Sequence, residues 1–344
     1  MKKIVLGDGR TVEVDEARYT ALDSLSAFAP LIMGVSGKDA TEAMAFIISQ
    51  LAYTEATVFE KMYQPMQYEQ LIPITNEAGE WAESIRYELY DYAGRGKRHS
   101  GKGQDINEVD VQVGDKTFPV VLGAVGYSYT TEELRKTAFL RRPISERKLA
   151  AAIEAYRRHM NDVGLYGENN LTGLFNNANV PQGNAPNGGW AAAIAADPVA
   201  GAIKILTDLN TLIQNIWNAT AYNDMLTDVV IAPTPYALIA STPRSANSDK
   251  TILQYLKENN IAKVERGIDI NFTPGYGLDT AGAGGTKRML GYVKSDQRLV
   301  MHIPLPLRFL APQLVGLSVK VPGEYKYSGV EWRYPKSAYY MDNL

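Results

Sequence analysis

Apolar residues follow helical spacing near the start of this chain, after a short extended segment. Residues 2–14 contain two apolar runs on either side of Gly7-Asp8-Gly9, a pattern that predicts a small hairpin. Between Thr41 and Met62, apolar residues recur near the spacing of a helix, which is expected to end at Tyr63-Gln64-Pro65. A mostly helical N-terminal arm is therefore expected.

From Glu83 the pattern changes to alternation, which predicts strands. Apolar or aromatic residues occupy every second position in two separate runs, Ile85, Tyr87 and Leu89, then Val109, Val111 and Val113. The two runs predict the strands of one hairpin. Their connection, Gly94–Gly103, contains four glycines, four positive charges and no acidic residue. We expect either a solvated loop or a tip that becomes ordered when a partner holds it.

A long amphipathic helix is the strongest single prediction. Thr130–Glu133 has the capping-box pattern that opens a first helix, and a longer one is expected over residues 144–166. Its apolar residues are spaced four, three, four and three apart, which forms one stripe along a rod of roughly 33 Å. The stripe consists of Leu149, Ile153, Tyr156, Met160 and Val163. We expect this helix to be a structural spine.

Basic residues gather around the predicted spine helix although the whole chain is slightly acidic. They include Arg141, Arg142, Arg157 and Arg158. A solvated helix face is one interpretation. The other is contact with neighbouring protein or with the phosphates of nucleic acid, without reading its sequence. Both interpretations stay open at this point.

Helices and strands alternate after residue 190, which favours a second, mixed domain. Asp197-Pro198 supplies an N-cap followed by proline at the first helical position. Val229–Ala232 is expected to be a short buried strand. Residues 314–321 and 325–340 are expected to be the last strands, with a turn at Pro322-Gly323-Glu324 between them.

Composition excludes several classes of protein. The 344 residues carry a formal net charge of -3, so the chain lacks the basic excess of a dedicated nucleic-acid binder. It contains no cysteine, which excludes disulfides and thiolate zinc sites. No apolar run approaches the ~18 residues of a membrane span, so no membrane contact is expected. Tyrosine outnumbers phenylalanine 21 to 8, which favours extensive contact between subunits because tyrosine packs well on half-buried surfaces.

No cluster of residues predicts catalysis. His99, His159 and His302 lie far apart in the sequence, so each is expected at a surface or an interface and not as a metal ligand. Gly34–Asp39 has some features of a phosphate-binding loop, but its glycine spacing is too short and an aspartate replaces the required Ser or Thr. The glycines in residues 275–286 do not open a helix after a strand, as a dinucleotide site requires. We expect no enzyme activity and no cofactor or metal.

The order of the predicted elements, together with three local stretches, resembles a known family. The stretches are Tyr127-Ser128-Tyr129-Thr130-Thr131-Glu132-Glu133-Leu134, Leu171-Thr172-Gly173-Leu174-Phe175-Asn176-Asn177, and Pro335-Lys336-Ser337-Ala338-Tyr339-Tyr340-Met341-Asp342-Asn343-Leu344. The chain is similar to the major capsid proteins of tailed bacteriophages, whose fold is named for phage HK97. The resemblance covers nearly the whole chain, and order and spacing carry it more than any one motif.

The resemblance implies an α+β, HK97-like capsid fold with five parts. These are an N-terminal arm (1–75), an extended β-hairpin loop (76–118), a peripheral domain (119–190) that contains the spine helix (144–166), a mixed apical domain (191–312), and closing strands of the peripheral domain (313–344). In this family the extended loop reaches over a neighbouring subunit. The tip residues expected to contact that neighbour are Arg95, Lys97, Arg98 and Lys102. Some relatives form covalent crosslinks through a loop lysine, but the sequence does not locate the acceptor that Lys97 or Lys102 would need.

The resemblance also implies function and partners. Copies of the chain would form pentamers and hexamers of an icosahedral head shell around double-stranded DNA, which they contact non-specifically. Further expected partners are a portal and separate scaffolding or cement proteins. The expected location is the virion, after synthesis in the host cytoplasm. An encapsulin-like cellular compartment and, more distantly, a two-domain soluble enzyme are the alternatives.

Overall fold

The computed structural model describes residues 2–5, 11–14, 64–96, 98, 108–130, 132–133, 144–245 and 248–344. The chain divides into two units, residues 1–63 and 64–344. In the first unit, β1 (Lys2–Val5) pairs antiparallel with β2 (Thr11–Val14), which confirms the predicted N-terminal hairpin. The helix predicted between Thr41 and Met62 lies outside the described residues.

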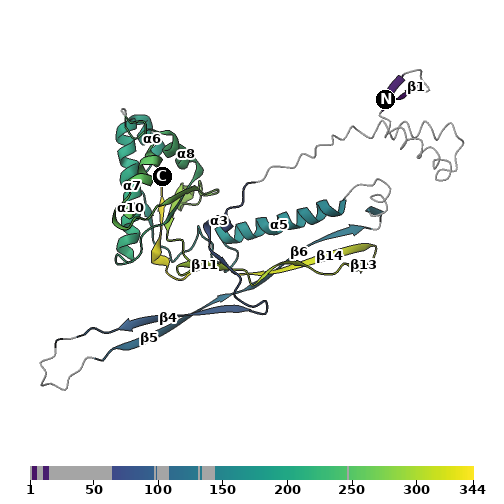
Figure 1. The fold of residues 1–344 in the computed structure, drawn as a ribbon, viewed down its shortest axis with the longest axis horizontal. Helices are drawn as coiled ribbons and strands as arrows, with labels where there is room; N and C mark the ends of the chain where they lie inside the picture. Colours follow the sequence, from purple (N-terminus) through teal and green to yellow (C-terminus); the bar gives the residue numbers. More distant parts are fainter. Residues whose placement is uncertain are drawn as a thin grey trace. The chain divides into compact units, whose positions relative to one another are not determined.

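The second predicted hairpin is also confirmed. Its strands, β4 (Ser84–Ala93) and β5 (Asp110–Pro119), pair antiparallel over their full length. Figure 1 shows them as a two-stranded ribbon in the second unit. The side chains of β5 are exposed on both faces along most of the strand. Since a two-stranded ribbon buries little apolar surface, it needs further packing to be stable.

Beyond Val120, the chain enters β6 (Val121–Thr130), which belongs to a different sheet. β6 pairs antiparallel with all ten residues of β14 (Ser318–Tyr327). On the other side of β14, β12 (Leu305–Phe309) and β13 (Gln313–Val315) pair one after the other. The spine helix α5 (Ile144–Tyr166) has the predicted bounds and runs beside β6 and β14 (Figure 1).

The predicted turn at Pro322-Gly323-Glu324 is wrong, because these residues lie inside the continuous strand β14. The carbonyl of Pro322 accepts from the N–H of Leu310, so the backbone of Pro322 faces the side of β12 and β13. Pro322 sits where β12 has ended and β13 has not begun, so its missing N–H removes no ladder hydrogen bond. Glycine is needed at position 323 because a Cβ there would lie 2.6 Å from the carbonyl oxygen of Val125 on β6.

A five-stranded sheet with helices against it forms most of the remainder. Its strand order is β7 (Gln182–Asn184), β16 (Ala338–Asp342), β10 (Arg288–Tyr292), β8 (Asp228–Ile231) and β9 (Asn271–Pro274). The helices and 3-10 turns of this part are α6 (Trp190–Ala196), α7 (Pro198–Ala219), α8 (Pro233–Ser241), α9 (Ile252–Glu258), α10 (Ile261–Arg266), η1 (Ala283–Gly285) and η2 (Pro335–Ser337). The side chain of Asp197 caps α7 by accepting from Val199 and Ala200, as predicted.

Two predicted domain boundaries differ from this arrangement. β16 falls within the predicted closing strands 313–344, yet it pairs with β10 of the five-stranded sheet. Residues 64–75 fall within the predicted arm, yet they belong to the second unit. There α3 (Tyr68–Leu71) contributes to the buried core, and β3 (Ile74–Thr75) pairs with β11 (Leu299–His302), which also pairs with β15 (Val330–Trp332). Such pairings join residues far apart in sequence, which local patterns do not show.

A buried ion pair ties β10 to β16. Two guanidinium nitrogens of Arg288 lie 2.6 and 2.9 Å from the two carboxylate oxygens of Asp342, and both side chains are buried. A third nitrogen of Arg288 donates to the carbonyl of Phe175 at 2.9 Å. A buried charge of this kind is tolerated because it is both paired and hydrogen-bonded. Within the described residues, no helix is long and apolar enough to cross a membrane.

Candidate assembly surfaces

The outer half of the β4–β5 hairpin has an apolar face. Tyr90 lies opposite Val113 and Tyr92 opposite Val111, so the four side chains project from the same side of the ribbon. Val109 follows on beside Gly94. We call these five residues, Tyr90, Tyr92, Val109, Val111 and Val113, the hairpin stripe.

The hairpin stripe is open to solvent. Its least exposed member, Val111, is 45% exposed and its most exposed, Tyr92, is 76% exposed. Contiguous exposed apolar surface is typical of interaction sites in proteins. The stripe was not predicted from the sequence, because the alternation of Ile85, Tyr87 and Leu89 leaves Tyr90 on the opposite face of the strand. The pairing register, which the sequence does not give, brings both tyrosines to the face of the valines.

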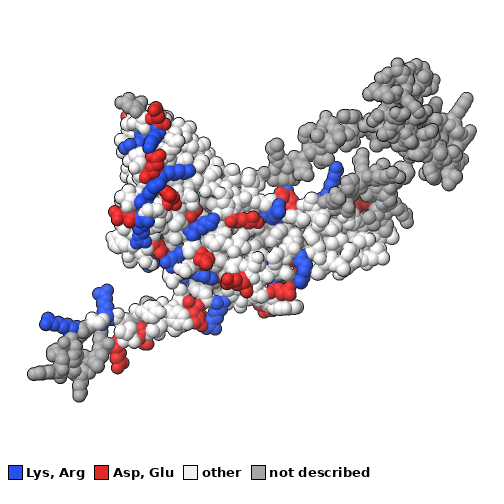
Figure 2. All heavy atoms as spheres, viewed as in Figure 1, with Lys and Arg blue, Asp and Glu red and all other residues white. Residues whose placement is uncertain are grey.

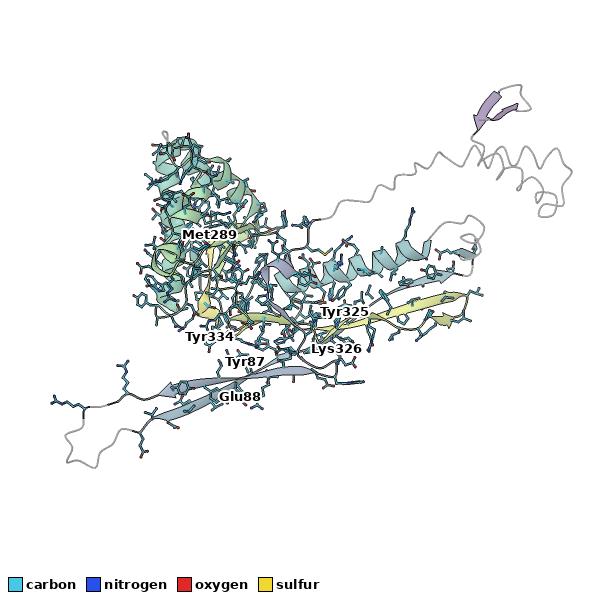
Figure 3. The ribbon with its side chains drawn as sticks, in the orientation of Figure 1. Tyr87, Glu88, Met289, Tyr325, Lys326 and Tyr334 are labelled. Carbon is cyan, nitrogen blue, oxygen red and sulfur yellow. The ribbon has the colours of Figure 1, made fainter. Side chains whose placement is uncertain are left out.

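The base of the hairpin is held against the rest of the second unit on its opposite face. Within the hairpin, the ring of Tyr87 stacks on Phe118 of β5 with 6.0 Å between centroids. The guanidinium carbon of Arg333, which follows β15, lies 5.7 Å from the centroid of the Tyr87 ring. Figure 3 shows Tyr87 on β4, beside Glu88. The base is therefore anchored through an aromatic side chain, whereas the outer half is not.

A buried carboxylate positions that arginine. Glu331 on β15 is fully buried, and its two oxygens lie 2.9 Å from Nε of Arg333 and 2.7 Å from Nε2 of His302. Burial raises the pKa of Glu331, but the hydrogen bonds from His302 and Arg333 outweigh it, so this pKa lies below its usual value. Among the described side chains, the hydroxyl of Tyr87 and Nδ1 of His302 are buried without a hydrogen-bond partner. His302 is thus a core residue, and its predicted place at a surface or interface is wrong.

The segment that leads into β4 is anchored as well. Arg308 on β12 lies 3.1 Å from Glu80 and 2.6 Å from Glu324. Nζ of Lys326 on β14 donates to the carbonyl of Ala82 at 3.4 Å. These contacts fix the start of the hairpin on the sheet of β12 and β14. Exposed pairs of this kind contribute little stability each, so they orient the segment more than they stabilise it.

Two of the four predicted tip residues are described, and they follow β4 at the far end of the same hairpin. Arg95 and Arg98 are exposed, whereas Lys97 and Lys102 lie outside the described residues. Figure 2 shows basic side chains at the outer end of the described hairpin and acidic ones along its strands. On the strands, Arg86 pairs with Asp115 at 3.1 Å. The outer hairpin therefore combines an apolar face with a basic end.

The spine helix presents its stripe to the core with a gradient of burial. Met160 and Val163 are fully buried, whereas Leu149, Ile153 and Tyr156 are partly exposed. The Tyr156 ring meets Tyr325 of β14 edge to face, with 4.8 Å between centroids. The C-terminal half of α5 is thus the more deeply packed half.

The four arginines singled out near this helix have different settings. Arg157 is exposed, and Arg158 pairs with Glu154 one turn earlier at 3.2 Å. Arg141 and Arg142 lie outside the described residues. The structure therefore does not bring all four together as one described basic surface.

Within the described residues, no group of three or more His, Cys, Asp or Glu side chains could hold a metal ion. Nε2 of His159 lies 3.0 Å from the hydroxyl of Tyr327, which donates to Glu168 at 2.9 Å. Burial, followed by this hydrogen bond, raises the pKa of Tyr327, so its hydroxyl stays protonated. His99 lies outside the described residues.

Comparison with known proteins gives a consistent result. Residues 94–344 match the family model described as major capsid protein. The capsid of the Myoviridae phage XM1 has 18% identity and a TM-score of 0.73, with 86% of this chain and 98% of that chain covered. A chain from Mycobacterium phage Ogopogo has 10% identity and a TM-score of 0.54, with 87% of this chain and 98% of that chain covered. The capsid of an empty GTA particle has 12% identity and a TM-score of 0.57, with 84% of this chain and 93% of that chain covered. No curated protein matches the sequence.

Proposed function

This chain belongs to the major capsid protein family, and from that premise we propose that its copies assemble into the icosahedral head shell of a tailed bacteriophage around double-stranded DNA. In this proposal the chain is a structural subunit and not an enzyme. Its pentamers and hexamers form the shell, and it becomes part of the virion. The hairpin of each copy packs on a neighbour.

The hairpin stripe is the observation that carries this proposal. Five apolar side chains stand between 45% and 76% exposed on a ribbon that cannot bury them itself. Burying such side chains contributes about 1 to 2 kcal/mol each, since a fully exposed side chain of this size would contribute roughly 1.5 to 3 kcal/mol. The entropic cost of association offsets much of that gain. A shell nevertheless becomes stable because every copy makes several such contacts.

The basic tip has a separate role in the proposal. Arg95, Lys97, Arg98 and Lys102 approach acidic surface on an adjacent copy. Charges at the edge of an interface speed up and orient association more than they increase affinity. In this proposal, the charges of the tip orient the hairpin during association, and the hairpin stripe supplies most of the affinity.

The arginines near α5 differ in the charge that they can offer to a partner. The exposed Arg157 is available to phosphates or to a neighbouring copy. Arg158 already neutralises Glu154, so it offers less net charge to DNA. We therefore assign non-specific contact with phosphates or with a neighbouring copy to Arg141, Arg142 and Arg157, and we expect a smaller contribution from Arg158.

Replacing part of the hairpin stripe tests the proposal. The chain with Tyr90→Ser and Tyr92→Ser is expected to fold but to stay dispersed in sedimentation and electron microscopy, because its neighbour contact has lost most of its apolar area. Gln112→Ser is the matched control, since it changes an exposed residue between Val111 and Val113 that faces the other side. Shells formed equally well by the double variant and the control would contradict the proposal. Nuclease-protected DNA in particles from infected cells would separate a phage head from a compartment that encloses protein.

A further inference from the structure

The edge of β6 that faces away from β14 has hydrogen-bond partners at both ends and an open stretch between them. Because Pro322 turns its backbone toward β12 and β13, its partner Gly126 in the antiparallel register turns its own N–H and C=O away from β14. Strand backbone groups alternate in direction, so Leu122 and Ala124 point the same way. The outer edge of β6 therefore carries the polar groups of even-numbered residues.

Both ends of that edge already have partners. At one end, the N–H of Val120 donates to the carbonyl of Glu83 at 3.0 Å. At the other end, Nζ of Lys148 donates to the carbonyl of Ser128 at 2.7 Å, and the N–H of Thr130 donates to Glu133 at 3.0 Å. The three residues, Val120, Ser128 and Thr130, are all even-numbered. These contacts therefore confirm that the backbone groups of even-numbered residues point away from β14.

The stretch between these ends is open. No hydrogen bond from a described residue reaches the outward backbone groups of Leu122, Ala124 or Gly126. All three residues are exposed, and the side chain of Leu122 is 60% exposed. The stretch is roughly 13 Å long at about 3.3 Å per residue, so it accepts a short strand and not a long one.

A short strand with exposed apolar side chains lies on the other side of β14 in the same sheet. β13 (Gln313–Val315) pairs with β14 on one side, and within the described residues no strand pairs with its other side. It leads into a turn at Gly316, and the apolar side chains there are strongly exposed: Leu314 is 75%, Val315 47% and Leu317 80% exposed. With three residues, β13 is short enough to lie within the five-residue opening of β6.

Neither edge carries the usual protection against pairing. Natural sheets place charged residues, prolines or bulges on exposed edges to prevent association. Leu122-Gly123-Ala124-Val125-Gly126 and Gln313-Leu314-Val315-Gly316-Leu317 contain no charged residue and no proline. Two unprotected edges on opposite sides of β14 give every copy one donor edge and one acceptor edge.

We propose that β13 of one copy adds as an extra strand to the Leu122–Gly126 edge of β6 in a neighbouring copy. This inference rests on the proposed function, because it requires copies to be neighbours. The contact is head to tail, so repeated pairing closes into a ring where the rotation between copies allows it. Backbone hydrogen bonds supply the pairing, and Leu314 and Leu317 gain apolar cover from the neighbour.

Single-cysteine copies test the pairing directly, because the natural chain has no cysteine. Copies with Ala124→Cys and copies with Leu314→Cys are mixed, assembled and treated with a short bis-maleimide. We expect a crosslinked dimer in the mixture, and its loss when the chain is dispersed. The matched control replaces Leu314→Cys by Val264→Cys, which is 76% exposed but lies on α10.

A proline variant tests the same contact through the backbone. Ala124→Pro removes an N–H that no described residue uses, so the dispersed chain is expected to keep its unfolding temperature and to lose assembly. Ala124→Ser keeps the N–H and is expected to assemble. If shells form but give no dimer above the control, or if Ala124→Pro assembles like Ala124→Ser, strand addition is overturned while the shell function stands. If the unmodified chain does not assemble under any condition, both are overturned.

Discussion

At the scale of single residues, one buried carboxylate connects the core to the hairpin base. Glu331 holds Arg333, and Arg333 lies over the ring of Tyr87. His302 occupies the second oxygen of Glu331. The Arg333 contact at the hairpin base thus depends on a charge that is fully buried, and such a charge is more consequential than the exposed pairs around it.

Glu331→Gln is expected to lower the free energy of unfolding by about 2 kcal/mol, because a neutral amide accepts more weakly from His302 and Arg333 than the carboxylate does and leaves the Arg333 charge without its counter-ion. Backbone amides near Tyr87 are also expected to exchange faster. Urea unfolding and hydrogen exchange measure the two effects. The control is Glu324→Gln, whose partner Arg308 is exposed, with an expected loss under about 1 kcal/mol. Equal losses in the two variants would contradict this role.

The same carboxylate predicts a loss of stability in acid. Its pKa is lower in the folded chain than the usual value of about 4.3, so the folded state binds fewer protons than the unfolded state. The stabilisation is complete above that usual value and disappears as the pH falls through the folded pKa. Urea unfolding of the dispersed chain between neutral pH and the acid limit should show a shallower decline for Glu331→Gln. Identical profiles would show that Glu331 does not contribute.

At the scale of elements, residue spacing and capping residues correctly predicted the helices and the hairpin that depend on interactions between residues close in sequence. The spine helix, the Asp197 cap of α7 and the β4–β5 hairpin follow from spacing and capping within a few residues, and the structure confirms them. Pro322 misled the prediction because a proline normally interrupts a strand. Whether it does so depends on the gap between β12 and β13, which is a tertiary feature. The pairing of Arg288 with Asp342 has no local signal either.

Close approach of β6 and β14 makes the glycines at their contact sensitive. Gly323→Val is expected to destabilise the chain by about 3 kcal/mol, because its Cβ would meet Val125 backbone oxygen at 2.6 Å and the Phe309 ring at 2.9 Å. Gly114→Val is the matched control, since a Cβ at this strand position meets nothing within 4 Å. Thermal unfolding compares the two. A control as damaging as Gly323→Val would refute the close-packing argument.

At the scale of the whole molecule, the sequence predicted that the hairpin carries an interaction surface, but it did not identify most of the residues that form this surface. The basic tip was visible as composition, and the exposed arginines Arg95 and Arg98 lie at the outer end of the hairpin. The hairpin stripe was not predicted, because the face shared by Tyr90 and Val113 depends on register. The network around Glu331 was not predicted, because β11 and β15 meet only in the folded chain.

Reversing the tip charges is expected to slow assembly more than it weakens the finished shell. Arg95→Glu with Arg98→Glu should reduce the initial rate of light scattering at low salt, and added salt should reduce the difference between variant and natural chain. Arg95→Gln with Arg98→Gln, which removes charge without reversing it, should fall between the two. Assembly rates that do not depend on these charges would exclude steering by the tip.

The central claim is that the hairpin stripe finds its cover on another copy of the same chain. Cryo-electron microscopy of particles assembled from the purified chain tests it most directly. The account predicts closed shells in which Tyr90, Tyr92 and the three valines are buried against a neighbouring subunit. A particle whose stripe faces solvent or folds onto its own subunit would contradict the account.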